Sequence, residues 1–234
     1  MDTLAELRQA VQSDLNIGDE STLFTTTAVD LAVNRAYRKA GALFPWPDLM
    51  DALKTTTQAN QEYYDYPFNW RANSIWKIKV DGERYGEKPD GSPLSFDDYL
   101  NWKEDYSDST DKKWANQWRR YFISPTPTVA DLEICVWGIM VTETLDSDGS
   151  VTIFSYAMPE CNEAVVLEAV AILKSKGELE KAGEFRSAEA KQILAGAWGR
   201  IRKENAKYEK NMPFFDVPNF YGNQSSSVDM RGRF

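Results

Sequence analysis

The sequence predicts an α+β protein in which helices near both ends of the chain enclose a β-rich middle segment. Near both ends, apolar residues recur every three or four positions, which is the period of a helix with one buried face. Between them lie short aromatic and β-branched runs with Asp-Gly pairs, the pattern of antiparallel hairpins. This order predicts an antiparallel helical bundle, built from the N- and C-terminal helix pairs, with an inserted antiparallel β-sheet or barrel-like segment.

The N-terminal helix pair of the bundle is expected within residues 1–47. Its second helix follows a run of threonines, where Thr27 and Asp30 have the spacing of a capping box. Gly41 and Pro45 are expected to end this helix. The first helix, over residues 3–15, has an apolar face formed by Leu4, Leu7, Val11 and Leu15.

A β-rich insertion is expected over residues 48–157. Asp81-Gly82 and Asp148-Gly149 are each typical of a two-residue hairpin connection. Ser95 is a candidate cap for one short helix within the insertion. The expected strands cover residues 62–67, 75–80, 83–85, 121–123, 132–144 and 150–156, and the short helix covers 96–103.

The C-terminal helix pair of the bundle is expected over residues 158–210. Pro159 suits the first position of a helix, and Gly177 is a candidate for its end. A longer helix is then expected from about residue 178. Because the links are short, each helix pair should form an antiparallel hairpin.

Residues 211–234 are expected to form an extended C-terminal tail. Pro213 and Pro218 interrupt helix formation, and the aromatic residues of this segment have no periodicity. Such residues favour association with a partner, although the tail could also fold back on its own domain. The candidate partner-binding residues are Phe214, Phe215, Phe220, Tyr221, Arg231, Arg233 and Phe234.

Charge and composition exclude several classes of function. The net charge of −9 argues against wrapping nucleic acid, because phosphate binding depends on Lys and Arg. An acidic wall can still let DNA slide past by repelling its backbone. The acidic start of the chain does not resemble a signal peptide, and the longest apolar run, residues 134–141, is too short to span a bilayer.

No catalytic, cofactor-binding or metal-binding residues are expected. Histidine is absent, and Cys135 and Cys161 are expected to be buried thiols. Neither a nucleophilic serine motif nor a phosphate-binding loop occurs in the sequence. One cluster of carboxylates is expected to lie on a solvated acidic loop; its members are Asp97, Asp98, Glu104, Asp105, Asp108 and Asp111. The cluster could bind calcium, but it lacks the spacing and central glycine of an EF-hand loop.

Several short motifs occur in an order that covers nearly the whole chain. They are Thr3–Leu7 with Ala32–Tyr37, Phe44-Pro45-Trp46 with Tyr64–Pro67, Tyr121–Pro127, Met158-Pro159-Glu160, and the alanine-rich stretch Ala188–Trp198. This layout resembles the head-to-tail adaptor family of tailed bacteriophages, also called head completion or tail accessory proteins. The β insertion is larger than in the smallest members of that family.

The resemblance implies a structural virion protein rather than an enzyme. Such adaptors form a ring beneath the portal, usually twelvefold, and extend the DNA channel without binding DNA specifically. They offer a docking platform for stopper, nozzle or tail proteins. The implied location is the head–tail neck of the virion, after assembly in the host cytoplasm. The resemblance also implies that residues 211–234 reach the portal.

Interface candidates within the insertion follow from residue type. Interfaces are enriched in Trp and Arg, and one Trp-rich stretch follows a charged segment that is expected to be exposed. The candidates for contact with neighbouring subunits or tail proteins are Trp114, Trp118, Arg119 and Arg120.

Two other functions fit parts of the sequence. A Trp-rich β segment could form a carbohydrate- or surface-binding module, but the helices and the aromatic tail would then have no explanation. A hydrolase that uses only carboxylates would need one Asp or Glu in an apolar pocket, and no sequence feature marks one.

Overall fold

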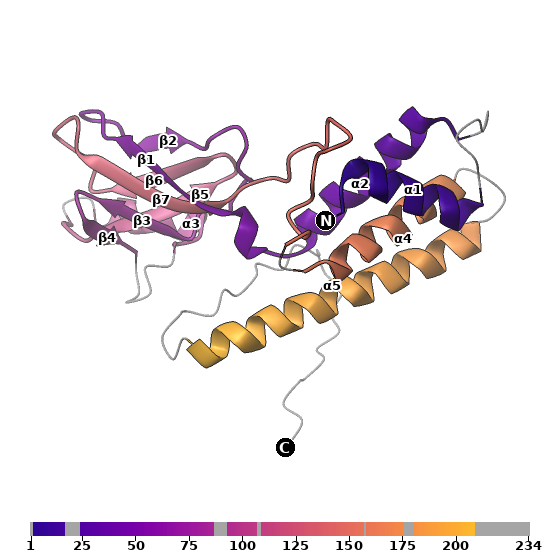
Figure 1. Ribbon diagram of the computed structural model, residues 1–234. Helices are drawn as coiled ribbons and strands as arrows, with labels where there is room; N and C mark the ends of the chain where they lie inside the picture. Colours follow the sequence, from indigo (N-terminus) through magenta and orange to yellow (C-terminus); the bar gives the residue numbers. More distant parts are fainter. Residues whose placement is uncertain are drawn as a thin grey trace, which may run out of the picture.

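The computed structural model of the chain describes residues 2–16, 24–86, 93–106, 109–156, 158–175 and 180–208. Helices and antiparallel strands occur in the predicted order, so the α+β class is confirmed (Figure 1). The helices are α1 (Leu4–Leu15), α2 (Thr26–Leu43), α3 (Phe96–Asp105), α4 (Glu160–Lys174) and α5 (Glu180–Tyr208). The strands are β1 (Met50–Thr56), β2 (Tyr63–Asp65), β3 (Lys77–Val80), β4 (Glu83–Tyr85), β5 (Lys113–Gln117), β6 (Arg120–Ser124) and β7 (Glu133–Ile139).

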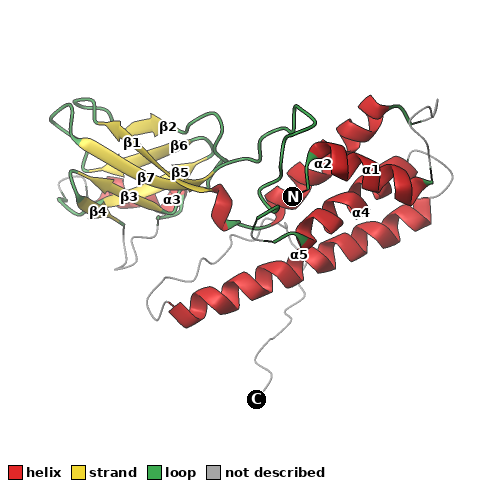
Figure 2. Cartoon of the chain, in the orientation of Figure 1, coloured by secondary structure: helices red, strands yellow, loops and turns green. Residues whose placement is uncertain are grey.

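The strands and α3 lie beside the remaining helices rather than between them (Figure 2). We call the strands, α3 and their loops, residues 50–139, the β part. We call α1, α2, α4 and α5, with residues 141–158, the helical part. Each has its own cluster of buried hydrophobic side chains, so the chain folds around two cores.

The caps of the N-terminal helices differ in one respect from the prediction. Thr3 and Glu6 form a capping box at the start of α1. The cap of α2 is Thr25 rather than Thr27, because the Thr25 side chain accepts a hydrogen bond from the Ala28 amide. Gly41 does not end α2, which continues to Leu43.

Gly41 instead allows a close approach between α2 and the chain that returns from the β part. A Cβ atom at this position would lie 2.1 Å from the Thr142 Cγ2 atom. The glycine therefore serves packing rather than helix termination.

Helices of the helical part bury a core of aliphatic and small residues. α1 contacts α2 and α4, α2 contacts α4, and α4 contacts α5. α4 and α5 are antiparallel, since Glu160 at the start of α4 pairs with Arg200 near the end of α5. Fully buried members include Val11, Val29, Val33, Ala36, Val165 and Ala169.

Two antiparallel sheets make up the β part. One has the strand order β1-β7-β3-β4 and the other has the order β2-β6-β5. Neither closes on itself among the described strands, so the barrel-like expectation is wrong. β7 pairs with β1 on one side and with β3 on the other, so it is an inner strand of its sheet.

The segment 150–156 was expected to be a strand, and this expectation is wrong. Asp148-Gly149 does form a turn, but Val151 makes only one isolated bridge, to Thr3. The Phe154 ring instead packs edge-on against Tyr37 and Trp46 in the helical core, with ring centroids 6.0 and 5.1 Å away. Burial against helices, rather than strand pairing, thus satisfies the apolar residues of this segment.

Candidate functional site

The most exposed aromatic side chains of the β part lie on two loops that contact each other. β5 and β6 pair as far as Gln117 and Arg120, which leaves Trp118 and Arg119 as a two-residue connection. Trp118 has a φ of 57° and its side chain is 72% exposed. Left-handed backbone is unfavourable for a bulky residue and is normally occupied by Gly, Asn or Asp in such turns.

Hydrogen bonds with the loop between β2 and β3 hold this turn in place. The Asn73 amide donates to the Trp118 carbonyl over 2.8 Å, and the Tyr66 amide donates to the Arg119 carbonyl over 2.9 Å. The Arg119 guanidinium donates back to the Trp70 and Pro67 carbonyls, over 2.9 and 2.6 Å. The surrounding loop therefore fixes the conformation of Trp118.

The same loop carries Phe68, whose side chain is 93% exposed. We call Phe68 and Trp118 the aromatic tip. Exposed aromatic residues that the fold does not bury are typical of contact sites for other proteins. Sequence reasoning missed Phe68, since a single phenylalanine between Pro67 and Asn69 belongs to no periodic pattern.

Arg120 lies next to the aromatic tip and is already paired within the chain. Its Nε atom lies 3.0 Å from the Asp65 carboxylate, and its guanidinium lies 4.9 Å from the centre of the Tyr63 ring. Tyr63 and Arg120 are exposed, so a partner could contact both without disrupting the core.

Trp114 was expected at the surface with these residues, and this expectation is wrong. Its side chain is fully buried, because it lies in the middle of β5 opposite Ile123. The structure thus brings Trp118, Arg119 and Arg120 together and assigns Trp114 to the core of the β part. The tail candidates Phe214, Phe215, Phe220, Tyr221, Arg231, Arg233 and Phe234 lie outside the described residues.

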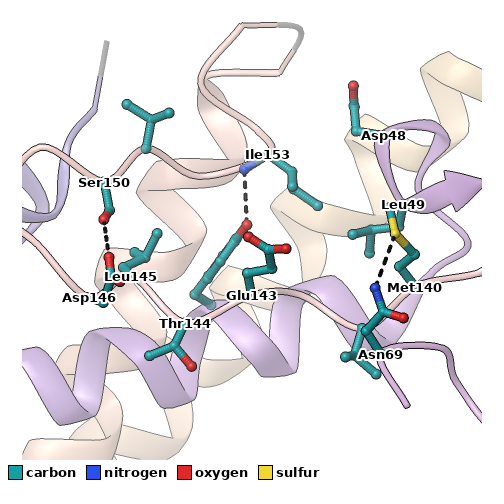
Figure 3. Close-up of a pocket in the computed structure, with 13 residues that line it drawn as sticks. Asp48, Leu49, Asn69, Met140, Glu143, Thr144, Leu145, Asp146, Ser150 and Ile153 are labelled. Carbon is teal, nitrogen blue, oxygen red and sulfur yellow. Dashed lines mark hydrogen bonds between the residues drawn. The ribbon is translucent and has the colours of Figure 1, made fainter. Parts of the chain in front are cut away.

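A hollow of about 430 Å³ opens where the helical part meets the β part (Figure 3). Its walls include Leu49, Met140 and the segment from Glu143 to Asp146. On one side the Tyr37 hydroxyl accepts a hydrogen bond from the Ile153 amide over 3.0 Å. Burial raises the pKa of Tyr37.

Carboxylates give this hollow an acidic lining. They are Asp48, Glu143 and Asp146, and no Lys or Arg is among the described residues that line it. The Asp146 carboxylate accepts a hydrogen bond from the Ser150 hydroxyl over 3.0 Å. The lining suits contact with a polar or basic surface better than binding of an anion.

The acidic stretch noted in the sequence is largely helical. Asp97 and Asp98 lie in the first turn of α3, where Ser95 caps the helix through the Asp98 amide. Carboxylates at this position stabilise a helix through its dipole. Asp108 lies outside the described residues.

Cys135 and Cys161 are buried free thiols, as expected, and burial raises the pKa of Cys161 to about 12. Within the described ranges, no group of His, Cys, Asp or Glu side chains is arranged to hold a metal ion. No helix in these ranges is long and apolar enough to cross a membrane.

Comparison with known proteins identifies a family. The model of a family described as SU10 adaptor protein matches residues 2–212. The match includes every described helix and strand, in both the helical part and the β part. No curated protein matches the chain.

Proposed function

The chain belongs to the SU10 adaptor protein family, and from this premise we propose that it forms a ring beneath the portal of a tailed phage. The family assigns it the role of a structural phage adaptor in the neck of the virion, where adaptors contact portal and tail proteins. The family match along residues 2–212 is the observation that carries the proposal.

In this proposal, neighbouring copies meet through two different faces, as closed rings with cyclic symmetry require. The ring is twelvefold and extends the DNA channel. The net charge of −9 supports a passive channel wall, because like charge repels the DNA backbone. The protein then acts by assembly and not as an enzyme, first in the host cytoplasm and finally in the virion.

Residues 211–234 supply the contact with the portal in this proposal. Their aromatic and arginine side chains are the types that dominate binding energy at protein interfaces. α5 ends at Tyr208, and its last turns extend past the start of α4 toward the side of the β part (Figure 1).

The aromatic tip supplies a second contact, with a neighbouring subunit or with a stopper, nozzle or tail protein. The exposure of Phe68 and Trp118 and the fixed turn beneath Trp118 support this role. Exposed rings also fit the alternative function, a carbohydrate- or surface-binding module.

Mass photometry of the full chain, alone and mixed with the portal protein of the same phage, tests the proposal. We expect a complex in which one portal carries a fixed number of adaptor copies. Deletion of residues 211–234 should abolish this complex while the circular dichroism spectrum stays helical. Absence of a complex with the intact chain, at both low and high salt, would contradict the adaptor ring, and a glycan array would then test the alternative.

The same assay, extended to the downstream tail protein, tests the aromatic tip. Phe68→Ala with Trp118→Ala should weaken binding to a neighbour or to the tail protein and leave portal binding intact. Phe185→Ala is the matched control, because Phe185 is 73% exposed and lies in the first turns of α5. Equal effects of the control and the tip variant would argue against a specific contact at the tip.

A further inference from the structure

The chain crosses between the helical part and the β part twice. The first crossing leads from the end of α2 through Phe44 to Leu49, and the second leads from Ile139 to Leu145. The acidic hollow opens beside both crossings, so apolar packing does not fill this side of the junction (Figure 3). Other contacts must therefore hold the two parts in one orientation.

Arg71, in the loop between β2 and β3, touches both crossings. Its Nε atom donates to the Met140 carbonyl over 3.1 Å, and its own amide donates to the Ile139 carbonyl over 2.8 Å. Its Nη1 atom donates to the Ala42 and Phe44 carbonyls, each over 3.4 Å. Its Nη2 atom donates to the Gly41 carbonyl.

The helix end that receives this guanidinium lacks a cation of its own. The last carbonyls of a helix have no partner within the helix and carry partial negative charge. α2 has no basic residue in its last turn, so Arg71 supplies the missing positive charge from the β part. None of the ion pairs among the described residues includes Arg71.

Burial affects the strength of this contact. It lowers the pKa of Arg71 to about 10, which still leaves the guanidinium charged at neutral pH. Hydrogen bonds from a charged donor in a poorly solvated site are stronger than those between neutral groups. A neutral side chain at this position would leave several carbonyls without a donor.

We propose that Arg71 fixes the orientation of the β part relative to the helical part by binding the C-terminus of α2 and the end of β7 at the same time. Without Arg71, the two crossings become a hinge while each part keeps its own core. The inference does not depend on the adaptor function, because it concerns how one chain holds its two cores.

Distance measurements between the parts test this inference. Spin labels would be attached through a keto amino acid placed at Thr56 and at Lys203, which are both exposed. This labelling chemistry does not react with the buried cysteines. Double electron–electron resonance should give one narrow distance distribution for the unmodified chain. Arg71→Met should widen that distribution roughly twofold or more, as expected when a hinge is released.

Arg119→Met is the matched control. Arg119 also donates to two backbone carbonyls, but both belong to the β part. It should lower the stability of the β part without widening the distribution. An unchanged narrow distribution in Arg71→Met, with circular dichroism showing a folded protein, would overturn the inference. If Arg71→Met does not fold, Arg71→Gln replaces it, since an amide cannot reach both crossings, and the same two outcomes apply.

Discussion

The helical part and the β part bury their residues in different ways. The helical core is built mainly from aliphatic and alanine side chains, such as Val33, Ala36 and Ala169, which let helices approach closely. Half of the buried residues in the core of the β part are tyrosine or tryptophan, such as Tyr66 and Trp70. Buried tyrosines need partners for their hydroxyl groups, so the β part is held together by polar contacts as well as by packing.

This contrast appears in individual contacts. The Tyr99 hydroxyl donates to the Glu62 carboxylate over 2.9 Å, and the Tyr66 hydroxyl bonds with the Asn116 side chain over 2.5 Å. In the helical core, Tyr37 is the one described tyrosine that is buried. The two cores should therefore respond differently to conditions that ionise tyrosine.

The largest expected difference is in alkaline solution. Burial raises the pKa of five tyrosines of the β part: Tyr64, Tyr66, Tyr85, Tyr99 and Tyr121. Unfolded tyrosines ionise near pH 10, whereas these folded ones keep their protons to higher pH. Above about pH 10 the unfolded state therefore binds fewer protons, and the stability of the β part falls as pH rises.

In the helical part, burial raises the pKa of one tyrosine, Tyr37, and of the Cys161 thiol. We therefore expect the β part to unfold at lower pH than the helical part. Tyrosinate absorbance should rise in a cooperative step while the helical circular dichroism signal persists. Loss of the helical signal before that step would contradict the comparison.

The next largest expected effect is a difference in unfolding free energy between alanine variants of two tryptophans in the β5–β6 hairpin. Trp114 is fully buried in β5, and Trp118 is 72% exposed at the turn. Trp114→Ala should cost about 3–5 kcal/mol of unfolding free energy, because it leaves a cavity in the aromatic core. Trp118→Ala should change it by less than about 1 kcal/mol. Urea unfolding measures both, and similar losses would show that Trp118 also supports the core.

These two residues show where sequence reasoning succeeds and fails. The helices follow from periodicity because a helix fixes its buried face locally, as Leu4, Leu7 and Val11 illustrate. The direction of Trp114 depends on pairing with β6, which the local pattern does not encode. Strands β5 and β1 were not predicted, because each depends on pairing with another strand, β6 for β5 and β7 for β1.

The helix caps and the aromatic tip also depend on features that the local sequence pattern does not encode. Thr25 and Thr27 have the same capping chemistry, and only the position of the helix decides between them. Trp118 and Arg120 were predicted as surface residues from type and context, and both are exposed. Phe68 and Arg71 were not predicted, because their roles arise from loops that meet only in the folded chain.

Alanine variants of two glycines, one in each part, should show a smaller difference in stability. A Cβ atom at Gly138 would lie 2.1 Å from the Trp70 ring, which is buried and cannot move freely. Gly138→Ala should therefore cost about 1–3 kcal/mol through overpacking. Gly41→Ala should cost less, because alanine favours the helix by about 1 kcal/mol and offsets part of the contact with Thr142. Thermal unfolding of both variants checks the order, and a larger loss for Gly41→Ala would reverse it.

The smallest expected effect concerns the backbone of Trp118. Asparagine tolerates left-handed backbone better than alanine, so Trp118→Asn should be about 1 kcal/mol more stable than Trp118→Ala. Equal stabilities would mean that the turn relaxes to another conformation once the ring is removed. If Trp118→Asn matches the unmodified chain in stability but loses its contact with the neighbouring subunit or the tail protein, the fold does not require the ring. The left-handed turn with its supporting loop would then serve to present an aromatic side chain to a partner.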